Sequence, residues 1–288
     1  MLIGAHVSTA GGLGKVVARG RELGCTAIQI FNQSPRAWRP TPHSDDDVAE
    51  FRSELADSEI GAVAIHAIYL INCASTERDV KRKSATSLVA ALRLGDAIGA
   101  DGVVLHPGAR KGRPHDASMR RAARAIASAL GESEGCPLLL ENTAGTQGPL
   151  GRNFDELADL IELAGTHSRL GVCVDCCHLL ASGFEIRKPS ELAAVVDELD
   201  AKVGLDRMRL LHVNDSKIPL GGNRDQHANV GAGALGRRGI ATFLSEPRFE
   251  GLPAILETPG PDGHGPDRAE VALTERLRRD GLRRRAER

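Results

Sequence analysis

The chain has 288 residues, of which 41% are hydrophobic and 26% are charged, as is typical of a soluble globular protein, and these proportions exclude a disordered or fibrous chain. Its 37 basic and 38 acidic side chains give a formal charge of −1, which excludes a uniformly basic nucleic-acid-binding surface but leaves room for a local basic patch. No apolar run is long enough to span a membrane, and the start of the chain does not have the pattern of a signal peptide. We therefore expect a cytoplasmic protein with no membrane partner, whose six cysteines are free thiols.

One pattern recurs about eight times: a short apolar run rich in valine, isoleucine and leucine, followed by a longer amphipathic stretch. Short runs that are apolar throughout are typical of parallel strands buried on both faces. The expected strands are Leu2–His6, Thr26–Phe31, Ala62–His66, Gly102–His106, Pro137–Glu141, Gly171–Asp175, Met208–His212 and Pro253–Glu257. The helical patterns between them include Leu13–Leu23, Arg78–Ile98, Ala117–Leu130, Phe154–Leu163, Ser190–Val203 and Ile240–Ser245.

This alternation predicts an α/β fold, a single-domain (β/α)8 TIM barrel over residues 1–275, followed by an arginine-rich C-terminal tail over residues 276–288. No linker rich in glycine, serine or proline divides the series. A doubly wound open sheet is the alternative fold, although Gly11-Gly12-x-Gly14 lacks the spacing of a dinucleotide-binding loop. For the tail, a solvated helix is one interpretation and contact with phosphate groups is the other.

Most of the expected strands end in a histidine or an acidic residue, namely His6, His66, His106, Glu141, Asp175, His212 and Glu257. A barrel enzyme builds its active site from the carboxyl ends of several strands at once. Imidazoles and carboxylates that converge on one rim would be costly to bury without partners, and metal ions would neutralise the carboxylates and use the imidazole lone pairs. The strand ends therefore predict a metal centre.

Three further possible ligands follow strand ends in the loops. His178 comes shortly after Asp175, and Asp225 and His227 lie in the glycine-rich loop after His212. Together with six of the strand-end residues they make nine nitrogen and oxygen donors. Such donors without thiolate suit zinc, with manganese or iron as alternatives, and nine of them fit two or three ions rather than one.

Nine segments spread over essentially the whole chain form a highly specific series: Gly4-Ala5-His6-Val7-Ser8-x-Ala10-Gly11-Gly12-Leu13, Pro35-Arg36-Ala37-Trp38, His66-Ala67-Ile68-Tyr69-Leu70-Ile71-Asn72, Leu105-His106-Pro107-Gly108, Leu140-Glu141-Asn142-Thr143-Ala144-Gly145, Val174-Asp175-Cys176-Cys177-His178, His212-Val213-Asn214-Asp215-Ser216-Lys217, Asp225-Gln226-His227-Ala228-Asn229-Val230-Gly231 and Leu256-Glu257-Thr258-Pro259. With these segments the sequence resembles the endonuclease IV family (AP endonuclease family 2) of abasic-site DNA repair enzymes. It departs from the usual pattern at Ile68, Cys176, Gln226 and Ala232, none of which is among the nine donors.

The resemblance implies three zinc ions per chain, with Mn²⁺ as a possible substitute. It assigns His66, His106 and Glu141 to the first zinc, then Asp175, His212 and Glu257 to the second with Glu141 as a bridge, and His178, Asp225 and His227 to the third. Glu141 and Glu257 are the expected catalytic carboxylates. The resemblance thus gives each of the nine donors an expected role.

The reaction that the resemblance implies is hydrolysis of the phosphodiester on the 5′ side of an abasic site in duplex DNA, leaving a 3′-hydroxyl and a 5′-deoxyribose phosphate, together with cleaning of 3′ ends. Arg36 and Tyr69, in the loops after the second and third strands, would enter the DNA and support a flipped-out abasic nucleotide. Lys217 and His6 are the other expected DNA contacts, and Trp38 is expected to pack. The enzyme would be a monomer in the cytoplasm, associated with the nucleoid.

Two other classes of function remain open. A divalent-metal sugar isomerase or epimerase of the same barrel superfamily would need only Glu141, Asp175, His212 and Glu257, and would leave the other five donors without a role. A non-enzymatic zinc or DNA-binding module would saturate its metals with protein donors, whereas catalysis needs an open coordination position.

Overall fold

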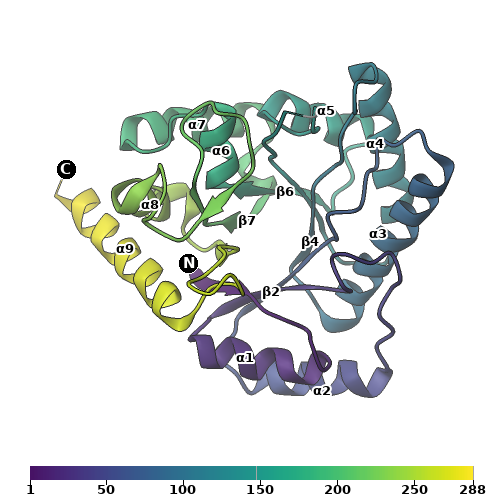
Figure 1. Cartoon of the computed structure of the whole chain (residues 1–288), viewed down its shortest axis with the longest axis horizontal. Helices are drawn as coiled ribbons and strands as arrows, with labels where there is room; N and C mark the ends of the chain where they lie inside the picture. The colour runs from purple at the N-terminus through teal and green to yellow at the C-terminus, as the bar shows by residue number, and fades with distance from the viewer. Residues whose placement is uncertain (147, 288) are drawn as a thin grey trace.

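The computed structural model describes residues 1–146 and 148–287, so Gln147 and Arg288, the last residue of the expected tail, lie outside the described residues. Parallel strands close into a barrel with helices around it (Figure 1). In chain order the barrel strands are β1 (Leu2–His6), β2 (Ala27–Phe31), β3 (Ala62–His66), β4 (Gly102–Leu105), β5 (Leu138–Glu141), β6 (Leu170–Asp175), β7 (Met208–His212) and β10 (Pro253–Leu256). They pair in the order β1-β10-β7-β6-β5-β4-β3-β2, which confirms the (β/α)8 barrel and excludes the open sheet.

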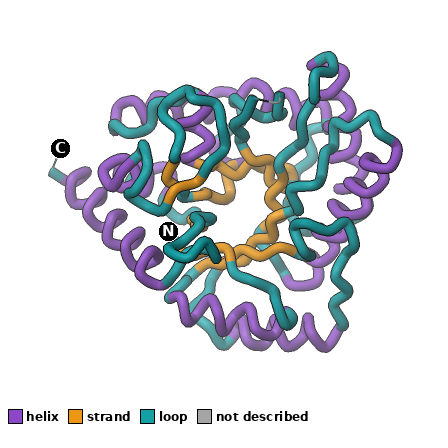
Figure 2. Tube along the Cα trace, viewed as in Figure 1, coloured by secondary structure: helices purple, strands orange, loops and turns teal. Residues whose placement is uncertain are grey.

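The helices form the outer ring around the strands, as Figure 2 shows by colour. Their bounds are α1 (Val16–Leu23), α2 (Asp45–Ala56), α3 (Arg78–Ile98), α4 (His115–Gly131), α5 (Phe154–Leu163), α6 (Cys176–Ser182), α7 (Pro189–Lys202), α8 (Gly236–Leu244) and α9 (Arg268–Ala286), with short 3₁₀ turns η1 (Leu13–Lys15), η2 (Leu205–Arg207) and η3 (Pro247–Phe249). Helices α2 and α6 are not among those that the sequence pattern indicated. Two very short strands, β8 (Asp215–Ser216) and β9 (His227–Ala228), also form an antiparallel pair outside the barrel.

Alternate residues of the strands face the barrel interior, because side chains point to opposite faces of a strand with a period of two. A separate cluster of buried apolar side chains from seven strands fills this interior, namely Ala27, Ala62, Ala64, Val104, Leu139, Cys173, Leu210 and Ile255. The intervening residues, such as Val63 and Ile65 of β3, belong to the larger core between the sheet and the helices. The interior is therefore a packed core that ends below the rim.

The arginine-rich segment belongs to the last helix of the barrel. Helix α9 begins at Arg268, so the boundary expected between residues 275 and 276 falls inside one helix. Helix α9 lies against α8 at Gly281, where a Cβ atom would come within 2.2 Å of the Ala241 carbonyl oxygen. Arg285 also donates to the carbonyl of Ser245, 2.7 Å away, just after α8. Helix α9 is thus held against the barrel wall at Gly281 and Arg285.

Within residues 1–146 and 148–287, none of the helices is both long and apolar enough to cross a lipid bilayer.

Candidate metal centre

The expected donors at the strand ends share one position in the alternation. His66, His106 and Glu141 each follow an inward-facing core residue by two positions, and Asp175, His212 and Glu257 do the same on the remaining strands. Because side chains alternate along a strand, this spacing points all six into the barrel just above its apolar filling. The hydrophobic core thus forms the floor of the site.

The structure brings the nine predicted donors into three groups, in each of which the donor atoms lie within 4.8 Å of one another. The groups consist of His66, His106 and Glu141, then Glu141, Asp175, His212 and Glu257, and finally His178, Asp225 and His227. These are the groupings that the family resemblance implies for three metal ions. Whether each residue binds a metal stays a prediction.

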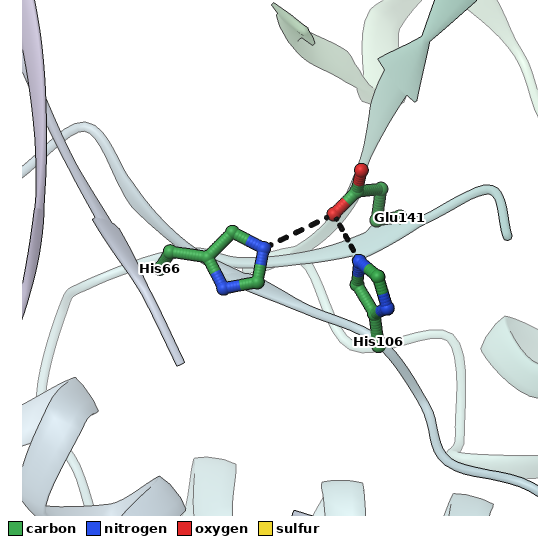
Figure 3. Close-up of side chains that lie close together, drawn as sticks. All are labelled: His66, His106 and Glu141. Atoms are coloured by element: carbon green, nitrogen blue, oxygen red, sulfur yellow. Dashed lines mark hydrogen bonds and ion pairs between the residues drawn. The ribbon is translucent and has the colours of Figure 1, made fainter. Parts of the chain in front are cut away.

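Glu141 lies between the groups, and both of its oxygen atoms face imidazoles. Its Oε2 atom is 3.3 Å from His66 Nε2 and 2.9 Å from His106 Nε2. Figure 3 marks both contacts with dashed lines. Its Oε1 atom is 3.0 Å from His212 Nδ1 and 3.2 Å from His178 Nδ1. A carboxylate with its two oxygens turned to different groups has the geometry of a bridging ligand.

The third group depends on local structure that the strand pattern did not predict. Asp175 ends β6 and caps α6, because its side chain accepts a hydrogen bond of 2.8 Å from the backbone N–H of His178. This turn places His178 in the first turn of α6. The β8–β9 pair holds the loop that carries Asp225 and His227, and it places Asp225 Oδ1 3.1 Å from His178 Nε2 and 3.3 Å from His227 Nε2.

Four of the five histidines are oriented by a hydrogen bond from one of their two ring nitrogens. The Nδ1 atoms of His66, His178 and His227 donate to the carbonyl oxygens of Ala67, Asn142 and Glu257 at 2.6, 2.9 and 3.2 Å. His212 donates instead through Nε2, to the side-chain oxygen of Gln29 at 2.9 Å. Each bond leaves the other nitrogen facing the centre, and this is the usual second interaction of a metal-binding histidine.

Two of the inward nitrogens lack a hydrogen-bond partner among the described residues. His178 Nε2 and His227 Nε2 are buried and unpaired although Asp225 Oδ1 lies near both, because the geometry does not suit a hydrogen bond. Buried polar atoms without partners are rare. A cation shared by these three side chains would use both lone pairs, so the residues fit a metal ion.

The charges of the centre are compatible with bound metal ions. Burial by itself would lower the pKa of His178, but the carboxylates of Asp175 and Asp225 hold this pKa well above its usual value. Burial would raise the pKa of Glu141, but the imidazoles of His106 and His212 hold it well below its usual value. The carboxylates thus require compensating positive charge, which either protons on the histidines or divalent cations can supply.

Cys177 lies close enough to Asp175 and His227 to be a possible ligand. Burial, however, raises the pKa of its thiol to about 12. A thiol that keeps its proton is a poor metal ligand. The nine nitrogen and oxygen donors therefore remain the expected ligands.

Three amide side chains that orient the centre were missed by the sequence reasoning. Gln29 donates from Nε2 to Glu257 Oε1 at 2.6 Å while it accepts from His212. Asn214 donates to Asp175 Oδ2 at 2.6 Å, and Asn142 accepts from the Asp175 backbone N–H at 2.7 Å. Gln29 could have been predicted from the sequence by the same alternation, because it stands two residues after the inward-facing Ala27 of β2.

A cavity of about 690 Å³ opens beside the centre, and two of the four residues expected to contact DNA line it. Tyr69 is 55% exposed, and its ring centre lies 4.9 Å from that of His66. His6 also lines the cavity, and its Nδ1 accepts a 3.3 Å hydrogen bond from Gln29. Arg36 and Lys217 are exposed on the loops after β2 and β8. The structure thus places Tyr69 and His6 at the centre and leaves the other two side chains in solvent.

Trp38, predicted to pack, is partly buried against the main hydrophobic core.

Comparisons with known proteins agree with this site. The family model described as xylose isomerase-like TIM barrel matches residues 17–279. The probable endonuclease 4 of Halothermothrix orenii is 38% identical over 97% of this chain and 100% of its own length, and that of Chloroflexus aggregans is 40% identical over 95% and 96%. The crystal structure of endonuclease IV from Thermus thermophilus matches with a TM-score of 0.85 and 36% identity over 99% of this chain and 100% of that chain.

A D-tagatose 3-epimerase-like protein matches with a TM-score of 0.73 at 18% identity, and this likeness concerns the fold alone. The endonuclease relatives match in sequence and in fold over nearly the whole length of both chains. The chain therefore belongs to the endonuclease IV family.

Proposed function

We propose that this protein hydrolyses the phosphodiester on the 5′ side of abasic sites in duplex DNA, leaving a 3′-hydroxyl and a 5′-deoxyribose phosphate, and that it also cleans blocked 3′ ends. We further propose that it uses three zinc ions, replaceable by manganese. It acts as a monomer on chromosomal DNA in the cytoplasm, in association with the nucleoid. Membership of the endonuclease IV family supports the reaction class.

The observation that carries this proposal is the set of three donor groups joined through Glu141. A sugar isomerase or epimerase would use one group of four ligands. It would give no reason for the unpaired inward nitrogens of His178 and His227, which belong to a separate group. A phosphodiester carries negative charge that increases during hydrolysis, so several cations side by side suit it better than a neutral sugar.

Divalent cations held by the three groups would lower the pKa of the attacking water, polarise the phosphate and neutralise charge in the transition state. Glu141 turns an oxygen to each side and so fixes the spacing of the groups. Glu257 accepts from Gln29 and lies 3.2 Å from His212, which holds its free oxygen toward the centre. We assign the catalytic carboxylates to these two residues.

The cavity beside the centre provides the contacts to DNA in this proposal. Burial lowers the pKa of His6 to about 4, so the ring is neutral at pH 7. Because its Nδ1 accepts from Gln29, its proton is on Nε2, which can donate to a phosphate oxygen. Tyr69 and Arg36 support the extruded nucleotide, and Lys217 contacts the backbone.

The test combines metal analysis with an incision assay on a duplex that has one abasic site. We expect about three zinc ions per chain and cleavage on the 5′ side of the site. One or two metal ions with turnover of a ketose would support the isomerase instead. Metal without turnover of either substrate would support a binding module.

Glu141→Gln tests the bridging role directly. We expect incision to be lost while binding of the duplex remains measurable, because the variant loses the bridging carboxylate but keeps the loops that contact DNA. Glu59→Gln, at an exposed glutamate remote from the centre, is the matched control and should incise normally. Incision by Glu141→Gln within about tenfold of the wild type would contradict the assignment.

A further inference from the structure

A groove between α8 and α9 is lined largely by arginine and is separate from the metal centre. Its volume is about 860 Å³, and six arginines line it: Arg237, Arg238, Arg276, Arg279, Arg283 and Arg284. Asp280 is the one acidic residue among the described residues of its lining. The groove thus carries a net charge of +5 in a chain whose formal charge is −1.

Most of this charge is not used in ion pairs. Arg283 pairs with Asp280, and Arg279 lies 4.0 Å from Glu275. The other four arginines are exposed, and none of them has an acidic partner within residues 1–146 and 148–287; they are Arg237, Arg238, Arg276 and Arg284. Like charges held close together destabilise a fold by mutual repulsion. The cluster is therefore hard to explain as a stabilising feature of the helices.

The position of Arg237 and Arg238 strengthens this point. Both lie in the first turn of α8, where the partial positive charge of the helix N-terminus disfavours cations. Acidic residues, not basic ones, stabilise this end of a helix. An anion bound in the groove would be attracted by the side chains and by the helix end together.

The two helices that form the groove pack closely, and the groove is long enough to contact several phosphates of a DNA backbone. Gly281 lets α9 approach α8 closely, and Leu273 and Leu277 supply an apolar floor between the arginines. Arg276 and Arg284 are about 12 Å apart along the helix axis at 1.5 Å per residue. That length of duplex DNA contains roughly seven phosphates over both strands, and about half of them belong to one strand. A rigid row of guanidinium groups on this scale matches a nucleic acid backbone better than a single small anion.

The groove is on the outer wall of the barrel, with α9 at the edge of the molecule (Figure 1), whereas the metal centre opens at the rim inside the ring of helices. We propose that the α8–α9 groove is a second DNA-binding surface, which holds the backbone phosphates of a duplex segment other than the one at the metal centre. The inference takes from the proposed function only that the protein works on DNA.

The test compares two fourfold variants with the full-length wild type. In the groove variant, Arg237, Arg238, Arg276 and Arg284 are changed to Gln. In the control variant, four exposed helical arginines elsewhere, Arg21, Arg52, Arg93 and Arg124, are changed to Gln, so both proteins lose the same charge. Binding of a long undamaged duplex is measured over a range of salt concentrations, and incision of a short abasic duplex is measured in a single turnover.

We expect the groove variant to bind the long duplex at least about tenfold more weakly at moderate salt. Its slope of log K against log salt should fall by about 0.9 for each phosphate that the groove no longer binds, to a maximum of about 3.6. The control variant should keep the wild-type slope, and both variants should incise the short duplex at the wild-type rate. Unchanged binding by the groove variant, or equal losses in the two variants, would overturn the proposal.

Vesicles containing anionic lipid separate this proposal from a membrane-binding role. Binding of the wild type to vesicles that the groove variant loses, with DNA affinity unchanged, would overturn the DNA assignment. If no protein incises the abasic duplex but the groove variant alone loses affinity for undamaged DNA, the proposed function fails and the second surface stands.

Discussion

At the scale of single residues, the hydrogen bonds behind the ligands decide what the centre can do. His212 is the one histidine of the four oriented rings that turns Nδ1 rather than Nε2 inward, because its Nε2 is bound to Gln29. Gln29 uses its whole amide: it accepts from His212 and donates to both Glu257 and His6. One side chain thus sets the orientation of a ligand on β7, a ligand after β10 and a residue that lines the cavity.

Gln29→Met should weaken zinc binding about 10–100-fold, the usual effect of removing a hydrogen bond behind a metal ligand. Methionine has a similar volume, so the barrel should keep its packing. Competition with a chelator measures the affinity. Gln33→Met is the control, because Gln33 is also buried but donates to the carbonyl of Ala37. Equal zinc affinity in the two variants would show that Gln29 only fills space.

The double variant Arg36→Ala/Tyr69→Ala should lose about tenfold or more in kcat/KM on an internal abasic site. Extruding a nucleotide costs a few kcal/mol of unstacking, which side chains in the vacated stack would offset. The loss should be smaller at a 3′-blocked nick, where the end is already frayed. The ligand variant His106→Ala is the comparison, and it should slow both substrates alike. Equal losses on both substrates for the double variant would mean that Arg36 and Tyr69 only bind the backbone or shape their loops.

At the scale of elements, buried carboxylates that bind backbone N–H groups hold the loops in place. Asp215 of β8 accepts from the N–H groups of Ser216, Gly233, Leu235 and Gly236, at 2.8 to 3.0 Å. It therefore joins the β8–β9 hairpin, which carries Asp225 and His227, to the start of α8. On the opposite face of the barrel, Asp96 of α3 accepts backbone hydrogen bonds in the same way and holds the turn before β5.

Asp96→Asn should destabilise the protein by about 1–3 kcal/mol at pH 7, because an amide cannot accept all the bonds that the carboxylate does. Asp96 accepts from the N–H groups of Glu134, Gly135 and Cys136 at 2.8, 2.8 and 2.6 Å. Burial would raise the pKa of Asp96, but these three bonds hold it below its usual value of 3.8. Urea unfolding measures the difference from the wild type.

The same pKa shift gives the pH dependence of this effect. A lowered pKa in the folded state contributes stability above pH 3.8, and the contribution is lost as pH falls through the lower folded value. The difference in the free energy of unfolding between Asp96→Asn and the wild type should therefore become smaller toward pH 2. Asp57→Asn changes an exposed aspartate and is the control. Its free energy of unfolding should equal that of the wild type both at pH 7 and near pH 2. If the difference between Asp96→Asn and the wild type does not change with pH, the stabilising role of the ionised Asp96 carboxylate is contradicted.

At the scale of the whole molecule, the metal centre joins strands from all around the barrel. The nine donor residues lie on β3, β5, β6, β7 and β9, on helix α6, and in the segments that follow β4, β8 and β10. Cations bound there would neutralise carboxylates that otherwise repel one another at the rim. Metal binding should therefore stabilise the entire barrel and not only its loops.

Removal of the metal by a chelator should lower Tm by about 10 °C. Free zinc at about 1,000 times Kd stabilises a folded protein by about 4 kcal/mol, and each kcal/mol shifts Tm by roughly 2–4 °C in a domain of this size. Calorimetry with and without EDTA measures the shift, and EDTA saturated with calcium is the control. A change below about 2 °C would show that the fold does not depend on the centre.

The barrel strands and the donor residues at their ends can be predicted from the sequence alone. Buried parallel strands are apolar along their whole length, so β1, β3 and β7 begin and end where the pattern predicts. The strand ends also named six of the nine donors, because each ligand stands at the point where the apolar run stops. Helix α2 was harder to find, since three aspartates fill its first turn after the Ser44 cap.

The folded barrel is needed to see which nitrogen of each histidine faces inward and where the arginines gather. Gln29 and His212 are far apart in the sequence, and their hydrogen bond exists because barrel closure brings β1, β2, β7 and β10 around one space. The α8–α9 groove arises in the same way, because Arg237 and Arg276 belong to different helices. The pattern of hydrophobic and polar residues reports on neighbours in the sequence. These features depend instead on contacts between residues that are far apart in the sequence, so the pattern does not predict them.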